Sequence, residues 1–162
     1  MNVPSANADS YGTGGSDVGW VPDNAGHNYC WSTGFVGTDV NAAARRAFAT
    51  GAVNNLDSQT DMYNAGQQGC TTSTDVYWAT FTAALDGQYQ CQLFNSAGFC
   101  DRSLVQINPS QMSPFDADWT QTTCHELGHS AGLAHATDDC MGTSTAFTTY
   151  STHHVGHINA QF

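Results

Sequence analysis

The sequence contains no lysine, and Arg45, Arg46 and Arg102 are its only permanent positive charges. Charged residues make up 10% of the 162 residues, against roughly 25% in an average soluble protein. The formal net charge of -11 argues against nucleic acid and against an anionic membrane surface as partners. Because no run of about 18 apolar residues occurs, no membrane-spanning helix is predicted either.

The sequence also lacks a CxxC pair and the apolar segment of a signal peptide. The first absence argues against a cysteine-rich zinc cluster. The sequence contains six cysteines, an even number, which predicts three disulfides formed in an oxidising compartment. We therefore expect a secreted, extracellular protein, present here in its processed form.

Six cysteines allow 15 pairings, and the sequence alone does not choose among them. Two pairings are attractive. One, Cys91–Cys100, would close a hairpin around LFNSAGF. The other, Cys124–Cys140, would join the residue before His125 to the residue before Met141. The third pair then follows by elimination. The expected disulfides are, in this order, Cys91–Cys100, Cys124–Cys140 and Cys30–Cys70.

Residue patterning predicts one domain over 1–162, with an irregular Gly/Ser/Asn-rich lead-in at 1–18. Within it, SLVQIN at 103–108 is the best candidate for an edge strand. The expected elements are a strand at 27–35, a helix from Thr38 or Asp39 to Leu56, a loop at 57–74, strands at 75–81, 87–94 and 99–108, a helix at 116–131 and a closing helix from Ser151.

The segment HELGHSAGLAH at 125–135 has the spacing of a zinc site. His125 and His129 lie four residues apart, so on a helix both imidazoles would lie on one face. Gly132 can end the helix and turn the chain so that His135 becomes a third ligand. Three histidines leave a fourth position for water, which is typical of a catalytic zinc site. Glu126, the only glutamate in the chain, is then the candidate general base.

This motif, followed by Met141 in DDCMG, resembles the signature of the metzincin zinc peptidases with their Met-turn. Within that clan the chain resembles the small, secreted, disulfide-bonded bacterial members. The resemblance extends through NYCWSTGF, DVNAAARRAF, CQLFNSAGFC and YSTHHVGHIN, and so covers most of the chain.

The resemblance implies an α+β fold with a twisted, mixed, five-stranded sheet, an antiparallel edge strand, two long helices, a Met-turn and a C-terminal helix. It also implies zinc ligation by His125, His129 and His135, with Met141 beneath the metal. Met141 follows His135 by only six residues, which leaves little room for a lower subdomain. The cysteine-switch motif of vertebrate matrixins is absent.

The functional hypothesis is a monomeric, zinc-dependent endopeptidase acting on proteins or peptides. Glu126 would accept a proton from water and pass it to the departing amine. The segment 142–150 would line the pocket for the residue after the cut. The alternatives are a zinc amidase acting on small non-peptide amides and a non-catalytic binding module that keeps the zinc fold as a scaffold.

Several further features have a structural and a functional interpretation. Tyr150 could assist an oxyanion, but packing against the last helix is favoured. His153, His154 and His157 could hold a second metal, but one or two buried, hydrogen-bonded histidines and one exposed histidine are the simpler interpretation. His27 is assigned no role. The four tryptophans are expected in the core. Calcium could bind at three aspartate pairs, Asp57/Asp61, Asp116/Asp118 and Asp138/Asp139, although none has an EF-hand pattern.

Overall fold

The computed structural model describes residues 13–15, 18–112 and 116–162. Its elements in chain order are β1 (Thr13–Gly15), β2 (Val18–Trp20), β3 (Gly26–Trp31), α1 (Val40–Gln59), β4 (Tyr63–Gln67), β5 (Val76–Thr80), β6 (Gly87–Phe94), β7 (Cys100–Ile107), α2 (Asp116–Ser130) and α3 (Thr152–Gln161).

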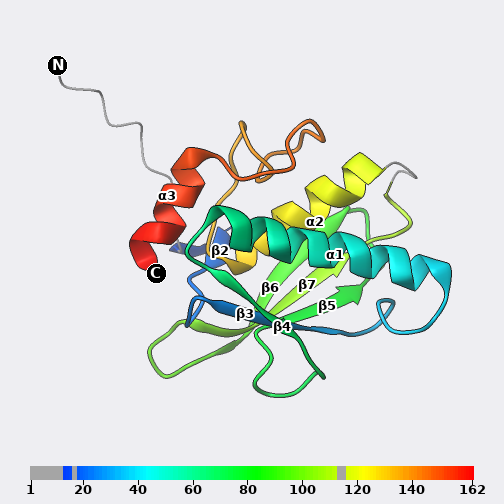
Figure 1. The fold of residues 1–162 in the computed structure, drawn as a ribbon, viewed down its shortest axis with the longest axis horizontal. Coiled ribbons are helices and arrows are strands. Elements are labelled where there is room, and N and C mark those ends of the chain that lie inside the picture. The colour runs from blue at the N-terminus through cyan, green and yellow to red at the C-terminus, as the bar shows by residue number, and fades with distance from the viewer. Residues whose placement is uncertain (1–12, 16–17, 113–115) are drawn as a thin grey trace.

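The fold is α+β and is built on a five-stranded sheet of strand order β4-β3-β5-β7-β6 (Figure 1). Neighbouring strands from β4 to β7 run parallel, and β6 pairs antiparallel with β7 at one edge. The expected mixed sheet with an antiparallel edge pair is therefore confirmed. The antiparallel pair follows from a short hairpin, since parallel neighbours need a longer crossover connection.

The two long helices, α1 and α2, lie side by side, and α3 lies towards one end of the molecule (Figure 1). Their apolar side chains form one core with the sheet, in which Trp78 of β5 and Leu127 of α2 are fully buried. Asp39 caps α1 by accepting a hydrogen bond from the Ala42 backbone N–H at 2.9 Å. The predicted helix is confirmed, and it runs three residues beyond the expected Leu56, to Gln59.

The prediction that residues 103–108 form an edge strand is wrong. Residues 103–108 belong mostly to β7, which pairs with β5 on one side and β6 on the other. Ser103, Val105 and Ile107 of β7 are buried, as an inner strand requires, whereas β6 is largely exposed and forms the edge.

Two segments expected to be irregular contain strands. β4 lies within the expected loop at 57–74 and pairs parallel with β3 at the far edge of the sheet. Part of the expected lead-in at 1–18 forms β1 and the start of β2, which pair antiparallel; residues 1–12 and 16–17 lie outside the described residues. β1 and β4 are short and polar or glycine-rich, so the local sequence pattern gives little indication of either strand.

Three disulfides are present, and they join the expected pairs, Cys30–Cys70, Cys91–Cys100 and Cys124–Cys140. They link β3 to the loop after β4, the two strands of the β6–β7 hairpin, and α2 to the turn that carries Met141. In the described part of the chain, no helix is long and apolar enough to cross a membrane.

Candidate metal centre

Helix α2 and the turn after it bring three histidines together. His125 and His129 lie on one face of α2, and the helix ends at Ser130. Gly132 then adopts a positive φ of 91°, a conformation that glycine reaches without steric cost. The chain folds back so that Leu133 N–H donates to the Gly128 carbonyl at 3.0 Å. This reversal returns His135 to the other two imidazoles.

The three imidazoles converge through their Nε2 atoms. His129 Nε2 lies 3.2 Å from His125 Nε2 and 3.2 Å from His135 Nε2. Two nitrogens bound tetrahedrally to zinc at about 2.0–2.1 Å would be about 3.3 Å apart, which matches this spacing. Among the described residues this is the one group of three or more His, Cys, Asp or Glu side chains placed to hold a metal ion. The residues present therefore fit a zinc ion.

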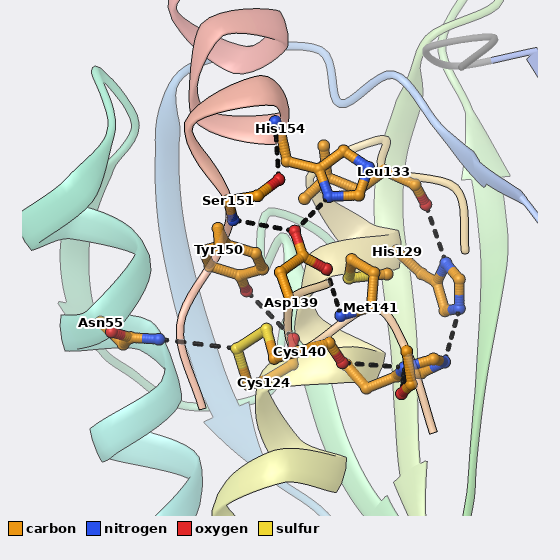
Figure 2. A network of polar contacts seen from close by, with 12 residues as sticks. Asn55, Cys124, His129, Leu133, Asp139, Cys140, Met141, Tyr150, Ser151 and His154 are labelled. Carbon is orange, nitrogen blue, oxygen red and sulfur yellow. Dashed lines mark hydrogen bonds and ion pairs between the residues drawn. A yellow bond between two sulfur atoms is a disulfide. The ribbon is translucent and has the colours of Figure 1, made fainter. Parts of the chain in front are cut away.

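Backbone carbonyls hold two of these imidazoles from behind. His125 Nδ1 lies 3.0 Å from the Cys140 carbonyl. His129 Nδ1 lies 2.8 Å from the Leu133 carbonyl (Figure 2). A carbonyl only accepts, so each Nδ1 must donate, and the lone pair of each Nε2 faces its neighbour. Such lone pairs at 3.2 Å need a shared cation or proton between them. This arrangement of outer partners is typical of histidines that bind a metal.

Burial favours the neutral form of both helical histidines. It lowers the pKa of His129 to about 3, and the nearby His125 acts in the same direction. Burial, followed by the charge of His135, also lowers the pKa of His125. A neutral imidazole is the form that binds a metal ion, so the protein keeps these ligands ready near neutral pH.

Met141 packs against Gly128 of α2 and is fully buried. Gly128, on the helix between His125 and His129, leaves the space that it fills, because a side chain at position 128 would overlap the Met141 sulfur. The Cys124–Cys140 disulfide joins the same two segments one residue before His125 and one before Met141. Helix and turn are therefore fixed to one another behind the histidines.

Asp139 anchors the turn of Met141 to α3. Its Oδ1 accepts from the Met141 N–H at 2.8 Å, and its Oδ2 accepts from the Ser151 N–H at 2.8 Å and pairs with His154 Nδ1 at 2.5 Å (Figure 2). Burial alone would raise the pKa of Asp139, but the hydrogen bonds from His154, Ser151 and Met141 outweigh it and lower the pKa to about 2. No local sequence pattern indicates this buried contact between Asp139 and His154, because the two residues are 15 apart in the chain.

Glu126 lies next to the three histidines and is 6% exposed. It faces Gly87, the first residue of β6, where an added Cβ would come within 2.6 Å of the Glu126 Cγ. Burial raises the pKa of Glu126 to about 8, and the nearby Asp86 carboxylate acts in the same direction. A cation bound at the adjacent histidines would oppose this shift and favour the carboxylate.

A cleft of about 860 Å³ runs past this group. Residues of the edge strand β6 line it, and so do Gly142, Thr143 and Ser144. Its lining includes all three histidines, Glu126 and Met141. A cleft of this volume has room for a small molecule or for a few residues of an extended peptide.

The other candidate residues lie outside the cleft lining. Tyr150 is buried and donates its hydroxyl to the Cys124 carbonyl at 3.0 Å, so it packs the helix rather than facing the cleft. Burial raises the pKa of this hydroxyl further from neutrality. His154 is buried in its pair with Asp139, while His153 and His157 are half-buried on α3, which supports the simpler interpretation of the three. Calcium gains no support, because none of the aspartate pairs joins a group of three ligands among the described residues.

Sequence reasoning missed two further features near the centre. His27, which was assigned no role, is buried, and its Nε2 lies 3.1 Å from the hydroxyl oxygen of Ser130 at the end of α2. Burial lowers the pKa of His27 to about 4, so it is neutral where it supports the helix. Trp20 was expected in the core but is 37% exposed and lines the cleft.

No protein-family model matches this sequence, and no curated protein matches it. The function of the protein must therefore be inferred from the site itself.

Proposed function

We propose that this chain is a secreted, zinc-dependent endopeptidase of the metzincin type. The observation that carries the proposal is that His129 Nε2 lies 3.2 Å from the Nε2 atoms of both His125 and His135. This group lines a cleft together with a buried glutamate and an edge strand. His125, His129 and His135 would hold the ion. When bound, zinc would supply a Lewis acid that polarises a carbonyl oxygen and makes water acidic near neutral pH.

The edge strand β6 would hold the substrate. Its outer side has no strand partner among the described residues, so an extended peptide can add to it through backbone hydrogen bonds. Backbone recognition suits an endopeptidase that accepts varied sequences. Residues 103–108 cannot bind a peptide in this way, because they lie mostly in the inner strand β7, between β5 and β6.

Glu126 would act as the proton carrier. Its carboxylate takes a proton from the attacking water as the new C–O bond forms at the peptide carbonyl. It then gives this proton to the amine nitrogen as the C–N bond breaks. Gly87 leaves the carboxylate room to lie between α2 and the bound peptide.

Digestion of a mixed peptide library, with and without a zinc chelator, tests the proposal. We expect cleavage that stops on chelation and returns when zinc is added back. Casein and a panel of small amides serve as parallel substrates. Hydrolysis of small amides alone would favour the amidase, and one bound zinc per chain without any hydrolysis would favour the binding module.

A further inference from the structure

Two aromatic side chains lie exposed at the cleft. Trp20, at the end of β2, is 37% exposed, and Phe94, at the end of β6, is 44% exposed. Their rings meet edge to face, with centroids 4.9 Å apart and planes at 80°. Both line the cleft that contains the three histidines. Exposed aromatic side chains that line a cleft are typical of sites that bind apolar groups.

Tyr89 connects this pair to the metal centre. Like Trp20 and Phe94, it lines the cleft, and its ring lies 6.0 Å from the His129 ring, measured between centroids. The pair therefore belongs to the same cleft as the candidate metal ligands.

The chain around the pair is firmly anchored. The Cys91–Cys100 disulfide joins the ends of β6 and β7, close to Phe94. Directly after Trp20, the Val21 carbonyl accepts from the Cys100 N–H at 2.9 Å, and the Asp23 N–H donates to the Cys100 carbonyl at 3.1 Å. One cystine thus fixes both aromatic residues, and a preorganised site loses little entropy on binding.

The direction of β6 decides which part of a substrate would reach the pair. β6 begins at Gly87, against Glu126, and ends at Phe94. A peptide that adds antiparallel to β6 has its N-terminal part near Phe94. The two positions are seven residues apart (94 minus 87), at most about 24 Å in a strand. The pair would then meet a side chain up to about six residues before the cut.

We propose that Trp20 and Phe94 form a subsite for an aromatic or large aliphatic side chain, upstream of the cleaved bond. The proposal rests on the endopeptidase function given above. The carboxyl residues of the lining are Asp86, directly before Gly87, and Glu126, which contacts Gly87. The β6 residues after Gly87 that line the cleft before Phe94, residues 88–91, are uncharged. An uncharged, aromatic surface of this kind selects apolar side chains.

Peptides that share one scissile bond and carry Phe or Ala at each of the second to sixth upstream positions test the subsite. At one or two positions we expect Phe to raise kcat/KM about tenfold over Ala, the effect of burying one aromatic ring. Trp20→Ala and Phe94→Ala should reduce this ratio to about twofold or less, and Trp20→Phe should restore much of it. Tyr63→Ala, which removes an exposed aromatic ring from β4 at the opposite sheet edge, should leave the ratio unchanged.

Binding provides a second readout that does not need cleavage. Calorimetric titration of zinc-loaded Glu126→Ala protein should give about tenfold lower Kd for the Phe peptide than for the Ala peptide. Adding Trp20→Ala should abolish the difference. Equal affinities, a preference that survives both aromatic substitutions, or a preference downstream of the cut would each overturn the subsite. Absence of cleavage by the parent protein would overturn only the endopeptidase function, since the titration still decides the subsite.

Discussion

The contact between Gly87 and Glu126 is where the edge strand and the catalytic candidate meet. An added methyl at position 87 would lie 2.6 Å from the Glu126 Cγ and 2.6 Å from its Oε1. The end of a flexible side chain can move, so the fold should tolerate Gly87→Ala while the carboxylate is displaced. We expect kcat/KM to fall about 10- to 100-fold, because small displacements of reacting groups slow a reaction by this amount. The variant should still bind one zinc.

Gly51 provides the matched control for this substitution. It lies in α1 with no atom within 4 Å of an added Cβ. Gly51→Ala should keep full activity and raise the free energy of unfolding by about 0.5–1 kcal/mol, because alanine favours the helix. Full activity in Gly87→Ala protein would show that Glu126 does not depend on this space.

Asp139 should make stability depend on acid pH. Its pKa is lowered from 3.8 to about 2 in the folded protein, so its charge adds about 2 kcal/mol to the free energy of unfolding above about pH 4. This contribution is lost as pH falls from about 4 to about 2. Asp139→Asn should therefore unfold more easily at pH 7, by about 2 kcal/mol, and differ little from the parent near pH 2.

Denaturant unfolding at a series of pH values measures this dependence. Asp138→Asn, which changes the exposed neighbour, should follow the parent at every pH. An equal loss of stability at pH 7 and pH 2 for Asp139→Asn would show that packing, and not the charge, explains the effect.

At the same scale, the sequence indicates some parts of the site and not others. The i,i+4 spacing of His125 and His129 and the turn at Gly132 follow from local geometry, so the three imidazoles could be anticipated. The contact of Asp139 with His154 and the exposure of Trp20 depend on how distant segments pack. No local pattern in the sequence reports them.

Among the elements, α2 and the turn of Met141 form the base of the centre, and the Cys124–Cys140 disulfide joins them across 16 residues. Replacing both cysteines by serine should lower the free energy of unfolding by roughly 3 kcal/mol. It should also weaken zinc binding by about tenfold or more, because Cys140 supplies the carbonyl that orients His125.

The Cys30–Cys70 bridge is the control, since it closes a loop of 40 residues away from the histidines. Its double serine variant should lose a similar amount of stability but keep its zinc affinity, measured by competition with a chelating dye. Equal losses of zinc affinity in both variants would contradict a positioning role for Cys124–Cys140.

The misplaced edge strand shows what local patterning leaves open. β7 has the alternation of a half-buried strand, and this pattern predicts a strand correctly without giving its neighbours. Its inner position results from pairing with β5, which is more than 20 residues earlier in the chain. β4 was missed because YNAGQ at 63–67 is polar and contains glycine, as an exposed edge strand can be.

For the whole molecule, a bound zinc ion should contribute to stability because the three ligands come together only in the folded chain. At a free zinc concentration of about 100 times Kd, the gain is about 2.7 kcal/mol. We expect the Tm to fall by about 5–10 °C on chelation. His129→Ala protein should show little response to the chelator in the same calorimetric scan, and an equal response would place the zinc elsewhere.

The central claim is that Glu126 catalyses peptide hydrolysis beside a zinc ion held by the three histidines. The most direct test compares cleavage of one peptide by the parent and by Glu126→Ala protein, both shown to contain one zinc per chain. The account predicts rapid cleavage by the parent and a loss of at least about 100-fold in the variant. Equal rates at equal zinc content would contradict it.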